Sequence, residues 1–498
     1  MSNRNGKNGN RGGTPLGKKP RPKKAEGEFA FAKDDAPRRD KPRAPEKKIS
    51  QFNMRLGEFS IDRMSHDGRG ISQWKDKTLF IDGALAGERV TARLLEEHSR
   101  YAEARADEVI AASPYRQPPP CAHYALCGGC QLQHLDPEQQ LLMKQDAVLE
   151  QLERWGGVIP RQVVTPIHSA SEGYRTRARL GVWYEDDGEV TLGFRQRQSN
   201  KLVQIDQCLV LAADLNRLLA PLKTWLTGLR SARAVTHIEL IAAHPGATLV
   251  LRHTKPLDAA DLAALESLAQ SLDFTVWLQG AEGASLKDFT GKLVDPRLVY
   301  QLQGPGLELG FHPQDFTQVN PQVNNKMVAQ AIEWLALQGD ERVLDLFCGI
   351  GNFTLPLAQR CAEVFGIEAV DSMVERGREN AARANIANVS FLAADLGKTS
   401  ENRLYQTCGE IDAVLLDPPR DGAKEIISKL PQLSPRRIVY VSCNPATLAR
   451  DAKVLAEAGY QLDSLGVMDM FPHTAHIESM ALFIKSKVSK SRAGQAKK

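Results

Sequence analysis

The sequence lacks any apolar run long enough to span a bilayer, and its first residues lack the apolar core of a secretory signal peptide. These absences exclude a protein held by membrane-spanning helices and predict a cytoplasmic protein with no membrane partner. In that reducing compartment the eight cysteines are not expected to form disulfides. With 42% hydrophobic and 25% charged residues the composition is that of an ordinary globular protein, and 498 residues predict two to four domains.

The positive charge is concentrated at the two ends of the chain. Residues 1–48 hold 15 Lys or Arg against 6 Asp or Glu, whereas the other 450 residues hold 49 against 54. This segment is rich in Gly, Pro and Asn and cannot bury enough apolar surface to fold, so we predict a disordered basic arm over 1–49. A second basic tail is predicted over 486–498. Such tails attract phosphates of any sequence, although they can equally serve only to keep a protein in solution.

The chain between these ends divides into three segments. Residues 50–110 contain short strand-like runs broken by Gly and Asp, which predicts a small antiparallel barrel. Residues 111–315 combine a cysteine group, a helix and alternating strands, which predicts a central α+β domain. The helix should begin after Asp136 as N-cap and end at Gly156 and Gly157. In the later strand YRTRARLGVWY we interpret three alternating arginines as an RNA backbone contact rather than a merely solvated face: Arg175, Arg177 and Arg179.

Residues 316–485 form the third segment, in which apolar strands alternate with helical stretches. The five expected strands are RVLDLF, EVFGIE, VSFLAAD, AVLLDPP and RIVYVSC. This alternation predicts an α/β domain with a parallel sheet and helices on both of its faces. Ligands of such sheets bind beyond the carboxyl ends of the strands, so the residues at these ends are the candidates for a site.

Two absences at these strand ends narrow the choice of ligand. The first turn has Gly349 and Gly351, but Thr354 stands where a dinucleotide-binding fingerprint has its third glycine, which counts against NAD. No phosphate-binding lysine accompanies the turn, which counts against ATP. The next three strands end in acidic residues: Glu368, Asp395 and Asp417. Strands that end in acidic residues, with no phosphate-binding lysine nearby, are typical of a site for S-adenosylmethionine. Glu368 is well placed to bind a pair of ribose hydroxyls.

Cys443 ends the fifth strand, in the stretch VYVSCNPATLARD. A buried inert cysteine is the ordinary alternative, but the turn after the strand should expose the sulfur. A thiolate of lowered pKa can add to C6 of a pyrimidine, which makes C5 nucleophilic toward a methyl sulfonium. A base must then remove the C5 proton. Glu478, in the stretch MFPHTAHIES, is the candidate base, with a solvent-facing glutamate at a strand end as the alternative.

Four stretches, in this order along the chain, resemble the RNA uracil-C5 methyltransferase family: DLFCGIGNFTLPLA, LLDPPRDG, VYVSCNPATLARD and DMFPHTAHIES. The resemblance implies methylation of a specific uridine in 23S rRNA with S-adenosylmethionine, and nothing in the sequence demands more than a monomer. It also implies a Rossmann-like class I methyltransferase domain over 316–485, with Cys443 as nucleophile and Glu478 as base. The implied cofactor contacts are Gln318, Phe347, Asn352, Glu368, Asp395 and Asp417.

The resemblance also interprets the N-terminal segments. Residues 50–110 resemble the TRAM domain, a small OB-like barrel that binds RNA. Four further residues have the spacing of metal ligands: Cys121, Cys127, Cys130 and Cys208. From spacing alone, structural zinc and an iron–sulfur cluster are equally plausible, and the resemblance implies a [4Fe-4S] cluster in the central domain. The remaining cysteines are expected to be ordinary core or surface residues: Cys348, Cys361 and Cys408.

Two other functions stay open from the sequence. A tRNA uracil-C5 methyltransferase shares the catalytic stretches, although that relative lacks both the cysteine group and the TRAM domain. A non-catalytic RNA-binding or ribosome-assembly factor would need only the barrel and the basic tails. Such a factor would have no use for Cys443, Glu478 and the acidic strand ends. Binding of S-adenosylmethionine would separate an enzyme from such a binding protein.

Overall fold

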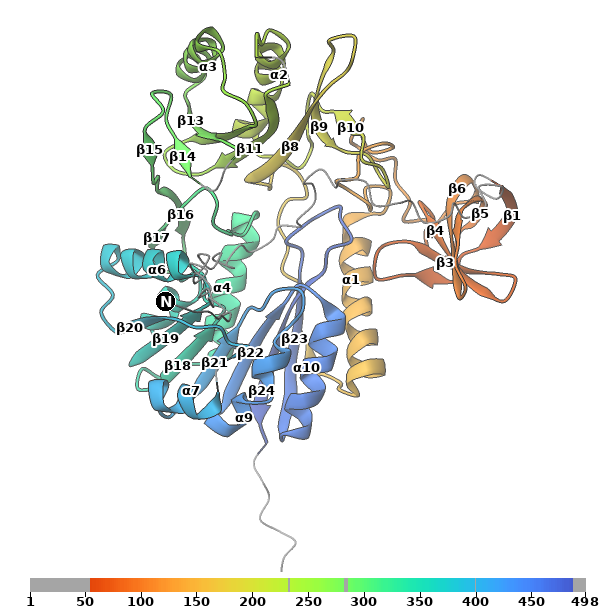
Figure 1. Ribbon diagram of the computed structural model, residues 1–498. Helices are drawn as coiled ribbons and strands as arrows, with labels where there is room; N and C mark the ends of the chain where they lie inside the picture. Colours follow the sequence, from red (N-terminus) through yellow and green to blue (C-terminus); the bar gives the residue numbers. More distant parts are fainter. Residues whose placement is uncertain (1–53, 232, 282–284, 399, 487–498) are drawn as a thin grey trace, which may run out of the picture. The chain divides into compact units, whose positions relative to one another are not determined.

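The computed structural model describes residues 54–231, 233–281, 285–398 and 400–486. The predicted basic arm and all but the first residue of the predicted basic tail lie outside the described residues. Of the helices in the described ranges, none is both long enough and apolar enough to cross a membrane. The strands and helices of the described residues fall into three sheets, a hairpin and the helices that cover two of the sheets (Figure 1).

The first described segment is a six-stranded sheet with an apolar core of its own. Its strands, in spatial order, are β1 (Arg55–Ser60), β5 (Arg89–Glu97), β6 (Tyr101–Ala111), β4 (Lys77–Asp82), β3 (Gly70–Trp74) and β2 (Arg63–Met64). Alternate side chains such as Leu79 and Ile81 point into the core and are fully buried. The strand pairs are antiparallel, as predicted, except that β4 and β6 run parallel.

Helix α1 (Pro137–Gln151) follows, and a π-helical turn (Leu152–Gly156) continues it. The side chain of Asp136 caps its start by accepting hydrogen bonds from two backbone N–H groups of the first turn. Gly157 ends the helix in the left-handed conformation, with φ of 62°. Both ends of the helix are therefore confirmed, because the capping residues that the sequence supplies are used as such.

An eight-stranded central sheet comes next, with α2 (Ala213–Thr227) and α3 (Ala259–Ser271) packed on it. Its strands, in spatial order, are β10 (Leu202–Gln204), β9 (Val190–Arg195), β8 (Arg177–Tyr184), β11 (Val235–Ala242), β12 (Ala247–His253), β13 (Phe274–Gln279), β14 (Leu286–Lys287) and β15 (Leu293–Val294). The hairpin of β16 (Leu298–Leu302) and β17 (Leu307–Phe311) leads from this sheet to the last one.

The arginines predicted to share one face of a strand are not equivalent. Arg177 is buried, forms an ion pair of 2.6 Å with Glu239 and donates hydrogen bonds to the carbonyl oxygens of Pro313 and Asp315. Arg175 lies before the strand, and of the three only Arg179 is exposed. The predicted row of RNA contacts is therefore wrong for Arg177, because its charge is paired inside the protein.

The C-terminal sheet also has eight strands. In spatial order they are β20 (Val389–Ala393), β19 (Glu363–Glu368), β18 (Arg342–Leu346), β21 (Ala413–Leu416), β22 (Arg437–Ser442), β24 (Glu478–Lys485), β23 (Tyr460–Met468) and β7 (Gln162–Val163). The first five run parallel, as predicted, and β24 is antiparallel to both of its neighbours. The carboxyl ends of the five parallel strands consequently meet at one edge of the sheet.

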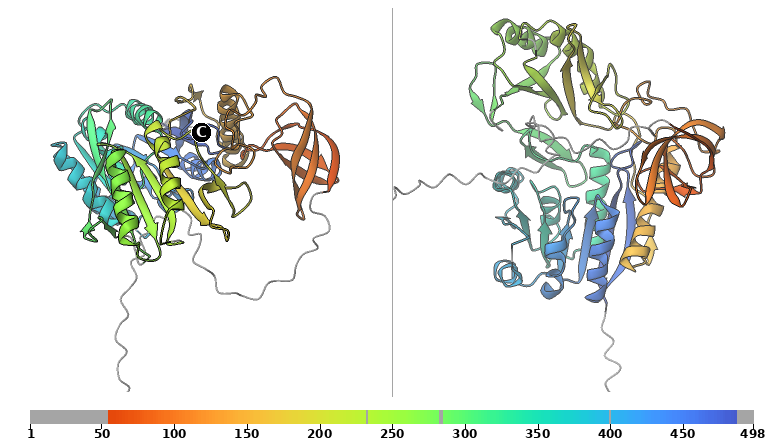
Figure 2. Two further views of the ribbon diagram at one scale, coloured as in Figure 1. Left: turned by 90° about the horizontal axis from the view of Figure 1, so that it is seen from above. Right: turned by 45° about the vertical axis from the view of Figure 1, so that its right-hand side comes forward.

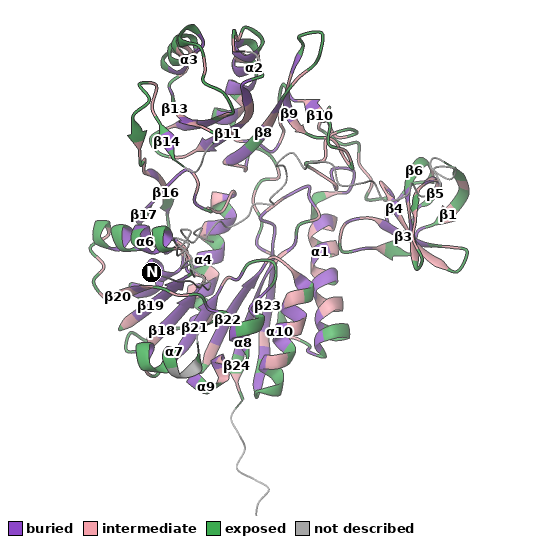
Figure 3. Cartoon of the chain, in the orientation of Figure 1, coloured by how far each residue is buried: buried purple, intermediate pink, exposed green. Residues whose placement is uncertain are grey.

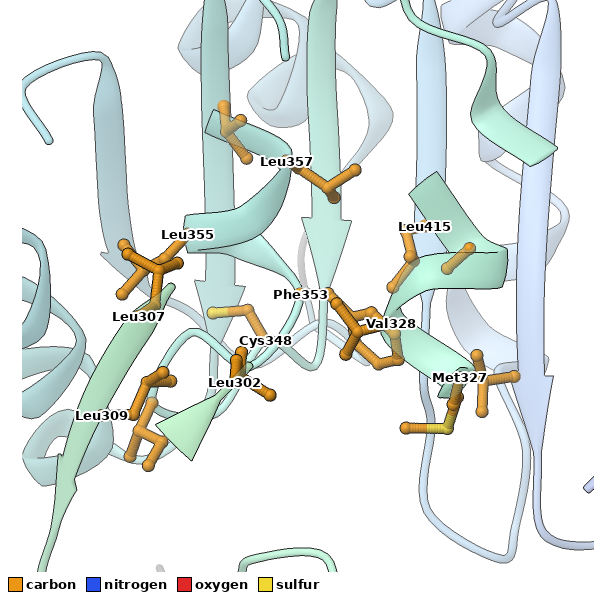
Figure 4. Close-up of a cluster of buried hydrophobic side chains, with 14 of the residues drawn as sticks. Leu302, Leu307, Leu309, Met327, Val328, Cys348, Phe353, Leu355, Leu357 and Leu415 are labelled. Atoms are coloured by element: carbon orange, nitrogen blue, oxygen red, sulfur yellow. The ribbon is translucent and has the colours of Figure 1, made fainter. Parts of the chain in front are cut away.

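Helices cover both faces of this sheet, as predicted. One face carries α4 (Pro321–Leu335), α5 (Thr354–Ala358) and α6 (Asp371–Arg383). The other carries α1, α7 (Glu401–Cys408), α8 (Lys424–Ile427), α9 (Leu430–Leu433) and α10 (Pro445–Glu457). Val343 and Leu344, which follow each other in β18, belong to the two opposite clusters of buried side chains. Figure 3 shows the strands between the helices as mostly buried, and Figure 4 shows part of the first cluster around Phe353 and Leu355.

Two elements from the N-terminal half complete the C-terminal sheet. Helix α1 lies beside α10 in both the first and the turned view (Figures 1 and 2) and contacts β23, and β7 pairs with β23 in parallel. Both elements lie within the segment predicted as the central domain. Contacts between that segment and the C-terminal sheet are therefore part of the fold.

Candidate active site

The turn after β18 forms the first wall of the site. Gly349 and Gly351 have φ of 56° and 99°, which favours glycine, and Phe347 has φ of 62° although it carries a side chain. Backbone strain of this kind persists mainly at functional sites, where the surrounding contacts hold it. Here the N–H groups of Phe347 and Cys348 donate to the carbonyl oxygen of Ile367 at 2.9 and 3.2 Å. The turn is therefore held against the end of β19.

The carboxylate of Glu368, the last residue of β19, faces this turn. One oxygen accepts a hydrogen bond from the N–H of Gly349 at 3.2 Å, and the other accepts from Ala369 and Val370 at 2.8 and 3.0 Å. Burial raises the pKa of Glu368 above its ordinary value. The residue thus lies at the predicted edge, with a carboxylate oriented by backbone donors.

Asp345 is a buried carboxyl group inside β18 that was not predicted as a site residue. Burial raises its pKa to about 8, and the nearby Asp417 and Glu368 act in the same direction. Its Oδ2 accepts a 2.6 Å hydrogen bond from the hydroxyl of Thr354, whereas no described residue donates to its buried Oδ1. Thr354 stands at the third position of the glycine pattern because its hydroxyl binds this carboxyl group. The feature of the sequence that could have identified Asp345 is an aspartate inside an otherwise apolar strand.

The other predicted cofactor residues differ in how they are held. The amide of Asn352 exchanges two hydrogen bonds of 3.0 Å with Asn324 and accepts one of 3.0 Å from the hydroxyl of Tyr300. Gln318 is half-buried and lies two residues before Asn320, the N-cap of α4. Asp395 is exposed and pairs with the lysine three residues later at 2.7 Å, which lowers its pKa. Asp395 is therefore the predicted residue that is least built into the site.

Cys443 and Glu478 come together because β22 and β24 are antiparallel neighbours. Ser442 lies opposite Ser479 in the register, so the next pair along the two strands is Cys443 and Glu478. Both residues are half-buried. Asp417 follows the end of the adjacent β21 and is close enough to raise the pKa of both. The structure thus brings the predicted nucleophile and the predicted base to one point of the sheet edge.

The turn after β22 was predicted to expose the sulfur of Cys443, whereas the residue is half-buried. Burial raises its pKa to about 12, and the negative charges of Glu478 and Asp417 act in the same direction, against the charge of Arg420. The thiol is therefore protonated at neutral pH, whereas addition to C6 needs its thiolate form. The main cause of the raised pKa is burial, which disfavours the charged form of the thiol, and the two carboxyl groups next to the sulfur add to it.

The carboxyl groups of Glu478 and Asp417 have pKa values close to neutral pH. Burial raises the pKa of Glu478 to about 8, with a further rise from Asp417 that the charges of Arg420 and Lys144 oppose. Burial raises the pKa of Asp417 to about 7. A glutamate that merely faces solvent would keep its ordinary pKa, so this alternative does not describe Glu478. A carboxyl group with a pKa near the working pH can both accept and release a proton.

Arg420 is a site residue that the sequence analysis missed. Its Nη2 lies 2.8 Å from Nδ1 of His476, and burial together with the charge of Arg420 lowers the pKa of His476 to about 4. The imidazole is therefore neutral at physiological pH and can accept the hydrogen bond. The side chains of Asn444 and Thr447 donate to the carbonyl oxygen of Arg420 at 3.1 and 3.3 Å. These contacts place a cation next to the turn that carries Cys443.

The four cysteines predicted as ligands converge from two segments. Cys121, Cys127 and Cys130 lie in the loop before α1, Cys208 lies before α2, and all four are half-buried. Burial and the charges of the other three sulfurs raise the pKa of Cys130 to about 12, yet no three of these four described sulfurs lie within 4.8 Å of one another. Arg197 donates to the carbonyl oxygens of Cys127 and Cys130 at 3.2 and 2.6 Å. The remaining cysteines are buried, as expected: Cys348, Cys361 and Cys408.

Comparison with known proteins shows the family to which the chain belongs. A family model described as tRNA (Uracil-5-)-methyltransferase matches residues 138–486. The chain belongs to this family. Two relatives share the name 23S rRNA (uracil(1939)-C(5))-methyltransferase RlmD. The protein of Alkalilimnicola ehrlichii is 47% identical and that of Alcanivorax borkumensis 44% identical, over 86% of this chain and 96% of each relative.

A solved structure supports the fold of this uracil-5-methyltransferase. The tRNA (uracil-54, C5)-methyltransferase of Pyrococcus abyssi, in complex with S-adenosyl-L-homocysteine, aligns with a TM-score of 0.66 and 24% identity. The alignment covers 86% of this chain and all of that chain. The predicted family and the predicted α/β methyltransferase fold are both confirmed. A non-catalytic assembly factor would need neither the fold of this family nor Cys443 opposite Glu478. An enzyme is therefore the better description of the chain.

Proposed function

We propose that this uracil-5-methyltransferase uses S-adenosylmethionine to methylate C5 of one uridine in 23S rRNA, at the position for which its relatives are named. The observation that carries the proposal is the strand register that sets the thiol of Cys443 opposite the carboxyl group of Glu478. A pyrimidine C5 needs both groups, one to activate it and one to release its proton. The names of the relatives favour 23S rRNA as the substrate over tRNA.

The chain supplies the two covalent steps. Cys443, as a thiolate, adds to C6 of the uracil, and the C5–C6 π electrons move toward O4 to give an enolate. S-adenosylmethionine, when bound, supplies the electrophilic methyl group that the enolate carbon C5 takes. Glu478 then accepts the C5 proton, the C5–C6 double bond re-forms, and the C6–S bond breaks with its electron pair returning to sulfur. Arg420 is the cation placed to favour the two negative forms, the thiolate and the enolate.

The strand ends fit a cationic nucleoside ligand. Asp345, Glu368 and Asp417 supply three carboxyl groups at one edge, and the buried Oδ1 of Asp345 has no donor among the described residues. The oriented carboxylate of Glu368 suits a pair of ribose hydroxyls, and the strained turn with Phe347 and Gly349 brings backbone close to it. These residues would hold S-adenosylmethionine, with Gln318, Asn352 and Asp395 as further contacts.

The N-terminal sheet is assigned to RNA binding as the TRAM domain. It presents exposed basic side chains at Arg55, Lys75 and Arg89, which suit phosphate contacts. The target base cannot be reached inside a duplex, so it has to lie in a loop or be flipped out. Unstacking the base costs a few kcal/mol, which RNA contacts made by this sheet can offset. The sheet would therefore contribute to affinity for the rRNA and leave the chemistry to the C-terminal domain.

A 23S rRNA fragment substituted with 5-fluorouridine tests the function. Because fluorine cannot leave C5 as a proton, the protein should stay covalently bound to the RNA through Cys443 when S-adenosylmethionine is present. Mass spectrometry of the cross-linked peptide would show the attachment site, and Cys443→Ala should form no adduct while still binding the cofactor. A tRNA substituted in the same way is the matched control. Adduct formation on the tRNA alone would show that tRNA, and not rRNA, is the substrate. The absence of an adduct on either RNA would refute the thiol mechanism.

We further propose that Cys121, Cys127, Cys130 and Cys208 hold a [4Fe-4S] cluster. A single zinc ion with Zn–S bonds of about 2.3 Å would bring its four sulfurs to about 3.8 Å from one another. The four sulfurs influence one another's pKa, but no three of them approach within 4.8 Å, which suits the larger iron–sulfur cluster better than zinc. The cluster takes no part in the covalent steps above.

The metal identity can be tested on purified protein. Wild-type protein prepared without oxygen should contain iron and acid-labile sulfide in equal amounts, and Cys127→Ser should lose both and bind the RNA more weakly. Cys361→Ser is the matched control, because the sulfur of Cys361 donates to the carbonyl oxygen of Leu357 at 3.2 Å and a hydroxyl can do the same. Zinc without sulfide in the wild-type protein would contradict the cluster.

A further inference from the structure

The loop between β23 and β24 leads directly into Glu478, whose backbone pairs with Met468 at the start of β24. We call residues 469–477 the glutamate loop, because Glu478 follows it directly. Among the described residues, no hydrogen bond or ion pair holds the side chain of Glu478 itself. Within the loop, His473 is almost fully buried and has φ of 67°, a conformation that side chains rarely adopt. Strand pairing fixes the backbone of Glu478 on the β24 side, and on the other side the course of the chain into Glu478 depends on contacts that hold the loop from outside.

The segment after the third cysteine provides one set of these contacts. The N–H groups of Gln131 and Leu132, which directly follow Cys130, both donate to the carbonyl oxygen of His473 at 2.9 Å. The hydroxyl of Tyr174 donates to the carbonyl oxygen of Pro472 at 3.1 Å. The strained part of the glutamate loop is thus held by residues that lie some 300 positions earlier in the chain.

Gln140, on α1, connects the segment that follows Cys130 with the glutamate loop, because its buried amide bonds to both. Its Oε1 accepts a hydrogen bond from the N–H of His473 at 2.9 Å. Its Nε2 donates to the carbonyl oxygens of Leu132 and Leu135 at 3.0 and 2.8 Å and lies 3.3 Å from Nδ1 of His473. Gln140 is 1% exposed, so water cannot replace these bonds without opening the fold.

Lys144, one helical turn after Gln140, holds the start of the same loop. Its ammonium group forms an ion pair of 2.7 Å with Asp469 and donates to the carbonyl oxygen of Phe471 at 3.3 Å. The side chain of Lys144 is fully buried. Helix α1 therefore attaches to the glutamate loop at two places, and both side chains face it from the same side of the helix because they are four residues apart.

We propose that Gln140 is a positioning residue for proton removal: through His473 it fixes the glutamate loop so that Glu478 meets C5 of the uracil. The inference rests on the proposed function. Cys443 belongs to the turn between β22 and α10 and is held by other contacts, through Asn444 and Ser442. Loosening the glutamate loop should therefore affect the release of the adduct and spare its formation. A displacement of about 1 Å in such a site can cost about 10²-fold in rate.

Gln140→Met tests the proposal, because it keeps the volume of the side chain and removes its amide. Single-turnover reactions with unmodified rRNA should show adduct formation and cofactor binding within about twofold of wild type, but release slowed by about 10- to 100-fold, so that adduct accumulates. Hydrogen exchange of the His473 amide should become faster at the same time. Gln139→Met, at the half-buried neighbouring position on α1, is the matched control and should behave as wild type.

Three outcomes would overturn the inference. The first is an unchanged rate of adduct release in Gln140→Met. The second is that adduct formation and release slow equally while hydrogen exchange of the His473 amide is unchanged, which would indicate that Gln140 is a purely structural residue. If Gln140→Met does not fold, the pair Lys144→Met with Asp469→Leu replaces it, because it removes the second attachment without leaving an unpaired buried charge. An unchanged rate of adduct release in this double variant would be the third outcome that overturns the inference. Failure of the wild-type protein to form any adduct would instead refute the proposed function itself.

Discussion

Glu478→Gln should lower turnover on the rRNA by about 10²- to 10⁴-fold while the covalent adduct of Cys443 with the uridine accumulates. The amide has nearly the shape of the carboxyl group but cannot accept the C5 proton. The addition of the thiolate to C6 and the methylation of C5 do not need Glu478, so the reaction should stop at the methylated adduct. A denaturing gel should show the protein retained on the RNA, and mass spectrometry should place one added methyl group on the trapped base.

The dependence on pH adds a second readout. The base acts in its ionised form, and the pKa of Glu478 is about 8, so wild-type release should become faster as the pH rises through about 8. The variant should lose this dependence. Glu457→Gln, at the exposed last residue of α10, is the control for removing a carboxylate from the same domain. If Glu478→Gln loses turnover without any trapped adduct, Glu478 acts before methylation and the base lies elsewhere.

The strands and their ends were predictable because the information is local. The five parallel strands are short apolar runs bounded by glycine, proline or acidic residues, and Cys443 and Asp417 follow directly from where such runs end. The place of Glu478 is different. It depends on β24 inserting antiparallel between β22 and β23, so that residues 442 and 479 pair. No local pattern encodes a pairing over such a separation, and only the resemblance to a family supplied it.

Charged residues were the weaker part of the sequence analysis. Lys144 and Arg177 stand in stretches that look like ordinary amphipathic surface, yet both are buried and paired, with Asp469 and Glu239. Burial of a charge depends on which partner the fold brings to it. The raised pKa of Cys443 could not be predicted from the sequence for the same reason. The carboxyl groups that raise it belong to other strands, and their distance from the sulfur is a property of the folded sheet.

The thiol of Cys443 should be almost unreactive toward iodoacetamide in the protein without ligands. With a pKa of about 12, against the ordinary thiol value of 9.0, the thiolate fraction at pH 8 is lower by about 10³-fold than for an ordinary cysteine. Alkylation of the Cys443 peptide, followed by mass spectrometry, should therefore be slow at neutral pH and become faster with each unit of pH up to about 12. This direction follows because the raised pKa keeps the thiol protonated until high pH.

Removing the neighbouring carboxylates should make the same thiol more reactive, although it removes catalysis. Glu478→Gln and Asp417→Asn should each lower the pKa of Cys443 and speed its alkylation above pH 8, where the wild-type carboxyl groups are ionised. Below about pH 7 the difference should vanish, because the pKa values of Glu478 and Asp417 are about 8 and 7 and both groups are then largely neutral. Glu457→Gln should leave the rate unchanged. Fast alkylation at neutral pH in the wild-type protein would mean that the thiol is already activated, and that ligand binding is not needed to form the thiolate.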